Sequence, residues 1–309
     1  HRDILAIADG YARHILSPVP NDIFAGSPPM GFTFGVVGLL VFPFRFGAAT
    51  SLLERFSPEA FVNMIRETGV TILFCSATTY NLLLKADLPE FASSCRSLRL
   101  CVSAGETLPA ATFHAWKERT GVEILDGIGS TEMLHIFVSS RPGETKPGAT
   151  GRAVPGYQAK IVDENFRELP PRQEGLLAIQ GPTGCRYWNR PERQREYVRD
   201  GWNLPGDVYV QDEQGYYNYQ CRADDMIISG GYNIAGPEVE TVLMEHPAVQ
   251  ECAVVASPDV TRGTIPKAFV VLRPGNHAGP EMVSELQAFV KSRLAPYKYP
   301  RSVEFISAL

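Results

Sequence analysis

Between residues 57 and 125 the hydrophobic pattern switches repeatedly between helical spacing and continuous apolar runs. Ser57 and Pro58 begin a helix that ends at Gly69 and carries apolar residues three or four positions apart. Residues 70–75 form a continuous apolar run, which is typical of a strand covered on both faces. The alternation continues with helices over 80–85 and 109–119 and strands over 98–102 and 122–125. This order predicts a parallel sheet with helical crossovers, an α/β fold.

The first 50 residues add a helix and a strand to this sheet. Apolar residues at helical spacing predict a helix over 4–16 that ends before Pro18. A strand over 21–25 then runs into a Gly/Pro loop at 26–29. Five aromatic side chains follow, and they are consistent either with ordinary core or with a flat slot for an aromatic ligand: Phe32, Phe34, Phe42, Phe44 and Phe46.

Polar loops are predicted directly after three of the strands, at residues 76–79, 103–106 and 126–132. Ligands of open α/β sheets bind at the carboxyl ends of the strands, so these loops are expected to lie at a binding edge. The third loop reads Asp126-Gly127-Ile128-Gly129-Ser130-Thr131-Glu132. Its glycines let backbone approach a ligand, and its hydroxyl and carboxylate suit a phosphate with Mg²⁺. A turn with a helix N-cap at Ser130 or Thr131 is the structural alternative, which the position at the sheet edge disfavours.

The pattern changes after Arg141, where Pro and Gly become frequent up to residue 156. A small antiparallel β unit is then predicted, with strands over 158–162, 176–180, 208–210 and 216–219 and a hairpin turn at 212–215. From residue 222 an α+β pattern begins, with a flexible loop over 229–233, helices over 237–245 and 281–294, and strands over 252–256, 267–272 and 302–306. We therefore expect three parts: 1–142, 143–221 and a lid-like domain over 222–309.

The composition is that of an ordinary globular protein, with 44% apolar residues, 20% charged residues and a net charge of −5 among 309 residues. Without a run of Lys or Arg, nucleic-acid binding is not expected. The most apolar stretch, 35–42, is too short to cross a membrane. The 6 cysteines and 6 histidines are dispersed, which favours reduced thiols in the cytoplasm and argues against a metal site built from protein ligands alone. No signal peptide is expected at the start of the sequence, and the chain is expected to be part of a longer one.

Four further motifs could hold a nucleotide, although each alone is equally consistent with a loop, a turn or exposed ion pairs. The first is a small-residue loop that could support a flat heterocycle. The second places a carboxylate after a glycine, which could bind a ribose diol. The third combines a cation with two anions, and the fourth is a Gly-rich loop. These motifs are Ser103-Ala104-Gly105-Glu106, Trp202-Asn203-Leu204-Pro205-Gly206-Asp207, Arg222-Ala223-Asp224-Asp225 and Ser229-Gly230-Gly231.

Taken in order, the motifs resemble the acyl-adenylate-forming superfamily, which contains acyl-CoA synthetases, luciferases and the adenylation domains of peptide synthetases. The long string from Arg222 to Glu240 is the most specific part of the match. Within the superfamily the chain is most similar to the benzoate-CoA ligase branch, and especially to 2-aminobenzoate-CoA ligases. That finer match rests on Gly26-Ser27-Pro28-Pro29, Thr33-Phe34-Gly35, the stretch 126–137 and Tyr232-Asn233-Ile234-Ala235-Gly236-Pro237.

The resemblance implies a large α/β domain with a small β unit, followed by a mobile C-terminal domain, and a two-step reaction. An aromatic carboxylate attacks the α-phosphate of ATP to give an acyl-AMP and pyrophosphate, and the thiol of CoA then displaces AMP. Small molecules are thus the expected partners, and a homodimer is left open.

The resemblance also implies roles for individual residues. Thr131 would hold a phosphate oxygen and Glu132 the Mg²⁺, Asp224 would be the hinge, and Asp207 and Arg222 would hold the ribose. The other nucleotide-binding residues would be Ser103, Ala104, Gly105, Glu106, Asp126, Gly127 and Ile128. The acyl pocket would contain Thr33, Phe34, Gly35, Gly129, His135 and Ile136, with a hydrogen-bonded structural histidine as the alternative for His135. The CoA tunnel would be faced by Ser229, Gly230 and Gly231.

Three departures from the superfamily pattern limit these expectations. The chain has neither the Lys-containing phosphate loop nor the Gly-Lys motif near the C-terminus, and Pro205 stands where many relatives have Thr. We expect the 309-residue chain alone to be inactive in adenylation and the whole protein to be a CoA ligase. Another adenylate-forming enzyme, using fatty acids or loading an amino acid onto a carrier, and a non-catalytic nucleotide-binding relative remain alternatives.

Overall fold

The computed structural model describes residues 1–86, 88–229, 232–259 and 262–309. They form two compact units, a first unit of residues 1–205 and 210–219 and a second unit of residues 206–209 and 220–309. The boundary runs through a β-hairpin, strands β12 (Asp207–Gln211) and β13 (Tyr217–Arg222). The expected division into three parts at residues 142 and 221 stays a prediction.

The first unit contains a seven-stranded sheet in the order β2-β1-β3-β4-β5-β6-β7. The first five strands of this order, β2-β1-β3-β4-β5, are parallel to one another. Strands β6 and β7 add antiparallel pairs at one edge. The strands are β1 (Ile23–Gly26), β2 (Ala49–Ser51), β3 (Ile72–Cys75), β4 (Leu100–Ser103), β5 (Ile124–Gly129), β6 (Ile136–Ser139) and β7 (Arg152–Ala153). The predicted parallel α/β sheet is confirmed.

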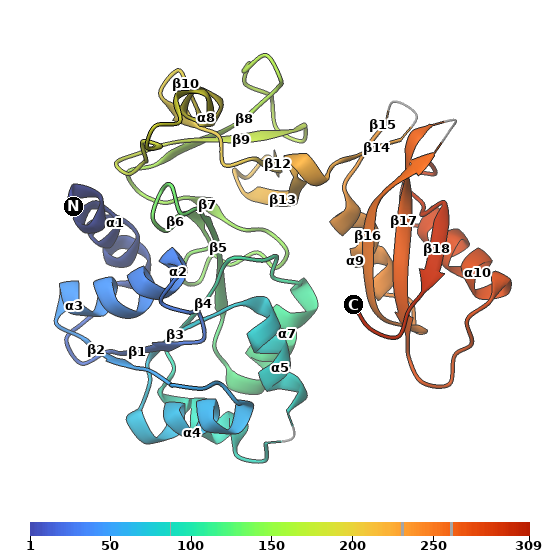
Figure 1. The fold of residues 1–309 in the computed structure, drawn as a ribbon. Coiled ribbons are helices and arrows are strands. Elements are labelled where there is room, and N and C mark those ends of the chain that lie inside the picture. Colours follow the sequence, from blue (N-terminus) through green and yellow to red (C-terminus); the bar gives the residue numbers. More distant parts are fainter. Residues whose placement is uncertain (87, 230–231, 260–261) are drawn as a thin grey trace. The chain divides into compact units, whose positions relative to one another are not determined.

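Helices cover both faces of this sheet (Figure 1). On one face lie α4 (Pro58–Thr68), α5 (Ala77–Lys85), α6 (Phe91–Ser94), the 3₁₀ turn η3 (Cys95–Ser97) and α7 (Ala110–Thr120). The caps of α4 are those expected, because the Ser57 hydroxyl accepts a bond from the Ala60 amide at 3.1 Å and Gly69 ends the helix at φ 68°. Leu73 and Cys75 of β3 belong to the buried cluster beneath these helices.

The other face meets the first segments of the chain. The predicted helix over 4–16 is confirmed as α1 (Arg2–Ile7) continued by the π-helix η1 (Ala8–Leu16). It is followed by α2 (Thr33–Val36), η2 (Val37–Val41) and α3 (Phe42–Phe46). Because side chains alternate along a strand, Phe74 points away from Leu73 and Cys75 and packs against Phe24 and Phe42.

All three predicted loops are wrong in part. Ser103, expected to begin the second loop, is the last residue of β4. Residues 77–79 already belong to α5, since the Ser76 hydroxyl caps the helix by accepting a bond from the Thr79 amide at 3.3 Å. Residues 126–129 are not a loop, because β5 continues through them and pairs with β6. No helix starts at Ser130 or Thr131 either: the Ser130 hydroxyl accepts a bond from the Met133 amide at 3.2 Å and closes a turn.

The predicted antiparallel β unit is confirmed as a six-stranded sheet. Its hairpin turn is held by Asp212, whose carboxylate accepts bonds from the amides of Gln214 and Tyr216, both at 2.9 Å. The sheet has the order β10-β11-β9-β12-β13, with β8 beside β9. Its remaining strands and its helix are β8 (Gln158–Val162), β9 (Glu174–Gln180), α8 (Pro191–Tyr197), β10 (Val198–Arg199) and β11 (Trp202–Asn203).

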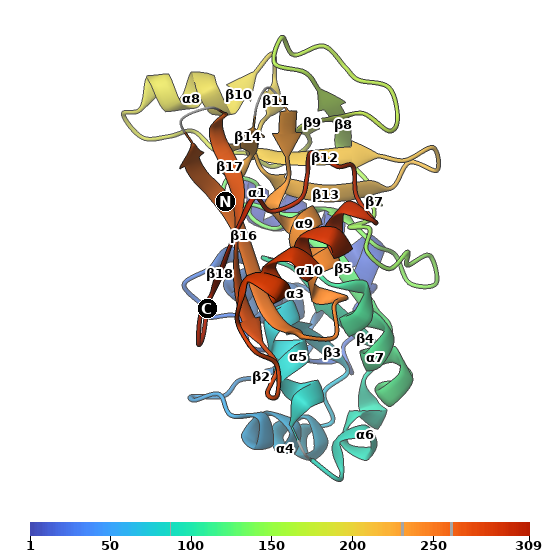
Figure 2. The same cartoon turned by 90° about the vertical axis from the view of Figure 1, so that its right-hand side faces the viewer.

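The second unit is built on a five-stranded sheet against which α9 and α10 pack together (Figure 2). Its elements are η4 (Ala223–Asp225), β14 (Ile227–Ser229), β15 (Tyr232–Ile234), α9 (Gly236–Met244), β16 (Val249–Asp259), β17 (Gly263–Leu272), α10 (Pro280–Lys291) and β18 (Ser302–Phe305). The α+β pattern is confirmed. The loop expected over 229–233 is wrong for Ser229, Tyr232 and Asn233, which pair as strand residues, and residues 230 and 231 lie outside the described part. Throughout the described ranges, every helix is too short or too polar to cross a membrane.

Candidate functional site

The end of β4 carries a buried hydroxyl and a loop fixed by one carboxylate. Ser103 is fully buried, and its Oγ has no hydrogen-bond partner among the described residues. Ala104 is also buried, whereas Gly105 is exposed at φ 88°, a conformation that favours glycine. The Glu106 carboxylate accepts bonds from the Thr78 amide and hydroxyl, so it is tied to the start of α5. The loop therefore presents small residues and backbone rather than a free carboxylate.

Asp126 lies beside this loop, in register with Ser103 across the β4–β5 pair. Burial raises the pKa of its carboxyl well above the usual range, and a bond from the Gly127 amide only partly opposes this. The Oδ1 atom has no partner in the part of the chain that the structure describes. A buried polar atom without a partner is costly, so Ser103 and Asp126 together mark a place where a ligand would complete the hydrogen bonding.

The two glycines of the motif are required by the close approach of β5 and β6. A Cβ on Gly129 would lie 2.4 Å from the carbonyl oxygen of His135, and one on Gly127 would lie 2.8 Å from the Ile136 side chain. Ile136 is buried and Ile128 is half-buried. The absence of a side chain at Gly127 and Gly129 therefore leaves room for Ile136 on β6 and for His135, the residue before it. The sequence suggested instead that the two glycines approach a ligand directly.

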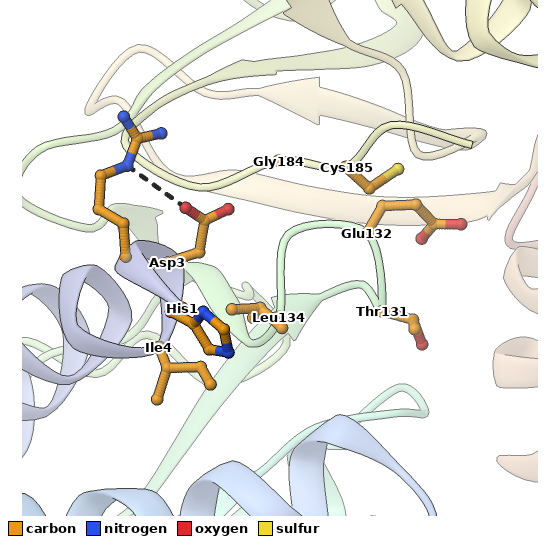
Figure 3. Close-up of a pocket in the computed structure, with 9 residues that line it drawn as sticks. His1, Asp3, Ile4, Thr131, Glu132, Leu134, Gly184 and Cys185 are labelled. Carbon is orange, nitrogen blue, oxygen red and sulfur yellow. Dashed lines mark ion pairs between the residues drawn. The ribbon is translucent and has the colours of Figure 1, made fainter. Parts of the chain in front are cut away.

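The turn after β5 carries Thr131, which is exposed, and Glu132, which is half-buried. Oε1 of Glu132 accepts a bond from the phenol of Tyr187 at 2.6 Å. Thr131 and Glu132 also line a cavity of about 530 Å³, together with His1, Arg2, Asp3, Ile4, Leu134, Gly184 and Cys185. In Figure 3, Thr131 and Glu132 lie on one side of this cavity and His1 and Ile4 on the other.

His135 is enclosed by four aromatic rings on the sheet face opposite α4 and α5. The ring centroids of Tyr11, Phe34, Phe42 and Phe74 lie 5.2, 5.6, 4.8 and 6.0 Å from that of His135. We call these five residues the aromatic cage. Burial lowers the pKa of His135 to about 3, so the imidazole is neutral at ordinary pH. Neither ring nitrogen has a partner among the described residues, which does not fit the alternative of a hydrogen-bonded structural histidine.

The other expected acyl-pocket residues are in α2, beside this cage. Thr33 and Phe34 are half-buried, and Gly35 is buried. A Cβ on Gly35 would lie 2.2 Å from the carbonyl oxygen of Pro29, so the helix can pack on the Pro28-Pro29 loop only with glycine there. Of the five aromatics that follow the loop, Phe34 and Phe42 join the cage, whereas Phe32 and Phe44 are exposed.

The second unit holds the remaining expected site residues. Asp207 is buried, its Oδ1 lies 3.4 Å from Nη1 of Arg222, and burial raises its pKa to about 6 against the opposing effect of Arg222. Asp224 is exposed and lies 3.3 Å from Nε of Arg222. Ser229 is buried, and its Oγ has no hydrogen-bond partner within the described ranges; Gly230 and Gly231 lie outside them.

The carboxylate of Glu132 is the group that could hold Mg²⁺. Within the described residues no cluster of three or more His, Cys, Asp or Glu side chains could hold a metal ion by itself. Mg²⁺ is usually bound by one or two carboxylates together with water and substrate phosphates. A single carboxylate beside an exposed hydroxyl therefore fits an ion that arrives with a nucleotide.

Sequence reasoning missed two sets of residues at this site. Tyr187 lies 55 positions from Glu132, and no spacing connects the two. The cage residues Tyr11 and Phe74 were assigned only to a helix and a strand. The helical stripe of Tyr11 and the strand alternation that separates Phe74 from Leu73 are the signals that could have found them.

Comparisons with known proteins find similar sequences and similar structures. A family profile described as AMP-binding enzyme matches residues 1–188, and one described as AMP-binding enzyme C-terminal domain matches residues 238–309. Benzoate–CoA ligase of Thauera aromatica is 41% identical over 313 residues, covering 100% of this chain and 59% of the relative. The mitochondrial acyl-coenzyme A synthetase ACSM3 of Homo sapiens is 38% identical over 308 residues, covering 96% of this chain and 52% of the relative.

Two solved structures are similar over almost the whole chain. The anthranilate CoA ligase AuaEII, in complex with anthranoyl-AMP, has a TM-score of 0.88 and 37% identity, covering 100% of this chain and 60% of that one. A benzoate CoA ligase from Burkholderia xenovorans LB400 has a TM-score of 0.89 and 38% identity, covering 99% of this chain and 62% of that one. The chain thus spans little more than half the length of these relatives.

Proposed function

The chain belongs to the AMP-binding enzyme family, and we propose that the protein carrying it joins an aromatic carboxylate to CoA through an acyl-AMP intermediate. The observation that carries this proposal is the aromatic cage. Its histidine, His135, comes shortly after the Thr131–Glu132 turn in the chain. Aromatic rings around one polar group are the kind of lining that a flat aromatic acid requires. The names of the similar proteins, a benzoate–CoA ligase and an anthranilate CoA ligase, support the same substrate class.

The preferred acid is proposed to be 2-aminobenzoate. A neutral imidazole offers one donor and one acceptor nitrogen, and both nitrogens of His135 are without partners among the described residues. An amino group on the aromatic ring can donate to the acceptor nitrogen, which benzoate cannot do. Burying an unpaired polar atom costs about 1–3 kcal/mol, so the substituted acid gains relative to benzoate.

In the first half-reaction the carboxylate oxygen attacks the α-phosphorus, and pyrophosphate leaves. Thr131 is proposed to donate its hydroxyl hydrogen to a phosphate oxygen, and Glu132 to bind Mg²⁺. When bound, the ion neutralises negative charge on the phosphates. Ser103, Ala104, Gly105, Glu106, Asp126, Gly127 and Ile128 are proposed to form the adenine side of the site, with the small loop residues as its platform.

Residues of the second unit are proposed to serve the ribose and the thioester step. The carboxylate of Asp207 would accept hydrogen bonds from the ribose hydroxyls, with Arg222 beside it. Asp224 is exposed at the start of this unit, which suits a hinge, and Ser229, Gly230 and Gly231 are proposed for the CoA path. In that step the thiolate of CoA attacks the acyl carbon, and AMP leaves.

A pyrophosphate-release screen with the protein that carries this chain tests the proposal. With CoA present, we expect turnover with 2-aminobenzoate, benzoate and hydroxybenzoates, and the highest turnover with 2-aminobenzoate. His135→Phe keeps a ring in the cage and removes both nitrogens, so it should reduce the preference for 2-aminobenzoate over benzoate by about fivefold, which corresponds to about 1 kcal/mol. Equal turnover of long fatty acids would reject the aromatic pocket, and an unchanged preference in the variant would reject the role of His135.

The acceptor of the acyl group needs a separate assay. Thioester formation is expected with free CoA and not with a carrier protein, and the opposite result would favour a carrier-loading adenylation domain. That the 309-residue chain alone does not form acyl-AMP also stays a prediction, and acyl-AMP made by the isolated chain would contradict it.

A further inference from the structure

One segment of the first unit contacts the Ser130–Met133 turn at three points. The Thr183 hydroxyl donates to the Met133 carbonyl at 2.8 Å, and the Tyr187 phenol donates to Oε1 of Glu132 at 2.6 Å. A longer contact of 3.4 Å joins the Tyr197 phenol to the Ser130 hydroxyl. Only the second of these contacts involves a group with proposed chemistry. We call residues 183–197 the brace.

We propose that Tyr187 is a positioning residue that fixes the carboxylate of Glu132 so that one oxygen is left for the ion carried by ATP. This inference rests on the proposed function. With Oε1 held by the phenol, the free oxygen has a defined direction before the nucleotide arrives. Such preorganisation reduces the ordering that binding would otherwise require.

The character of the partner supports this role. A phenol is neutral, so it orients the carboxylate and leaves its negative charge available for a cation. A Lys or Arg in the same place would compensate that charge, but no ion pair to Glu132 is found in the described part of the chain. Hydrogen bonds to an ionised acceptor are also short and strong, in agreement with 2.6 Å.

Tyr187 is itself held in place by the rest of the brace. Its ring meets that of Tyr197 edge to face at a centroid distance of 5.7 Å, and the Arg193 guanidinium lies 5.0 Å from its ring centre. Its backbone amide donates to Oε1 of Gln194 at 2.8 Å. A side chain restrained on several sides can define the direction of its hydroxyl, which a free surface tyrosine could not do.

The test compares ATP binding by calorimetry in excess Mg²⁺ and in EDTA, using the protein that carries this chain. The unsubstituted protein should bind ATP more tightly in Mg²⁺ than in EDTA, and we call the ratio of the two affinities the Mg²⁺ gain. Tyr187→Phe should reduce this gain about tenfold and leave the ATP affinity in EDTA unchanged. In pyrophosphate release the variant should need about tenfold more Mg²⁺ for half-maximal rate, with kcat within about twofold at saturating Mg²⁺. The matched control is Tyr216→Phe, which removes a phenol that donates to the Glu144 carbonyl and should change neither value.

A double-mutant cycle separates positioning from a structural role. In a Glu132→Gln background Tyr187→Phe should have no further effect on the Mg²⁺ gain, because the group through which it acts is absent. Gln194→Ala removes the side chain that accepts a bond from the Tyr187 amide but keeps the phenol and changes no charge, so it should reduce the gain by about two- to threefold. It provides a second variant if Tyr187→Phe melts below the assay temperature. An unchanged Mg²⁺ gain in Tyr187→Phe, or an equal effect in both backgrounds, would overturn the inference alone. Absence of ATP binding in the unsubstituted protein would instead reject the proposed function.

Discussion

The carboxylate of Glu106 accepts two hydrogen bonds from Thr78, one from the backbone amide at 2.5 Å and one from the hydroxyl at 2.9 Å. These two bonds join the loop after β4 to the first turn of α5, which follows β3, so the exits of the two strands are tied together. The carboxylate also lies at the positive end of that helix. Glu106 is thus positioned to shape the proposed adenine platform through its neighbours.

Glu106→Ala should therefore weaken AMP binding by about fivefold, corresponding to about 1 kcal/mol, because the platform loses its tie to α5. Thr78→Val removes only the hydroxyl bond and keeps the amide bond, so a smaller loss is expected. Calorimetric titration with AMP measures both. An equal loss in the two variants would indicate that the helix amide does not hold Glu106.

Adenosine affinity should fall as the pH falls through about 6. The pKa of Asp207 is raised to about 6, with burial as the largest cause, so its carboxylate is protonated below that value. A protonated carboxyl is a poorer acceptor for ribose hydroxyls, and affinity at pH 5 should be about tenfold lower than at pH 7. Adenosine is the ligand of choice because the phosphate of AMP titrates in the same range. Asp207→Asn should bind more weakly at pH 7 and lose this pH dependence, and a dependence that persists in the variant would assign it to another group.

The strands and helices could be predicted because their hydrophobic patterns are local. The Ser57 and Gly69 caps and the apolar run ending at Cys75 were sufficient to predict α4 and β3. The path of residues 126–129 was not predictable in this way. Gly127 and Gly129 resemble loop residues, but their small size serves the pairing of β5 with β6, which depends on residues 136–139.

The site was predictable where a motif is continuous and not where it is assembled from distant segments. Thr131 and Glu132 are adjacent in the sequence, so the roles proposed for them can be inferred from the motif alone. The cage and the brace depend on packing: an all-apolar run conceals which side of the strand Phe74 faces, and Tyr187 reaches Glu132 only because the chain returns over the turn. Unpartnered atoms such as the His135 nitrogens are visible only in three dimensions.

An ion pair between buried Asp22 and partly exposed Arg99, at the amino ends of β1 and β4, should contribute to stability. Asp22 is buried, and Nε and Nη2 of Arg99 donate to its carboxylate at 2.8 and 2.7 Å. Burial raises the pKa of Asp22, but the bonds from Arg99, from the Val19 amide and from Thr71 outweigh it and lower the pKa below 3.8. Arg99→Met leaves this carboxylate buried without its cation and should cost about 2–4 kcal/mol in the free energy of unfolding.

Urea unfolding at several pH values checks this prediction. Because the folded pKa of Asp22 is depressed, its stabilising effect is present above 3.8 and is lost as the pH falls through the folded pKa. The difference in the free energy of unfolding between Arg99→Met and the unsubstituted protein should thus become smaller below about pH 4. Arg66→Met, which removes an exposed pair with Glu90, is the matched control and should cost less than about 1 kcal/mol. A comparable loss in the control would mean that burial is not the reason.

Gly35→Ala should disrupt the proposed acyl pocket, even though alanine is the better helix former. In most helices this change stabilises by about 0.5–1 kcal/mol. Here the added Cβ would lie 2.2 Å from the carbonyl oxygen of Pro29 and 2.7 Å from that of Pro28, and neither backbone atom can move without shifting the loop. We expect a loss of about 1–3 kcal/mol in the free energy of unfolding, together with weaker binding of the aromatic acid. Gly31→Ala is the matched control, because its Cβ would meet no atom within 4 Å, and it should change stability by less than about 0.5 kcal/mol. Thermal unfolding and acid titration measure both variants, and equal behaviour of the two would show that the close approach of α2 to the proline loop does not constrain residue 35.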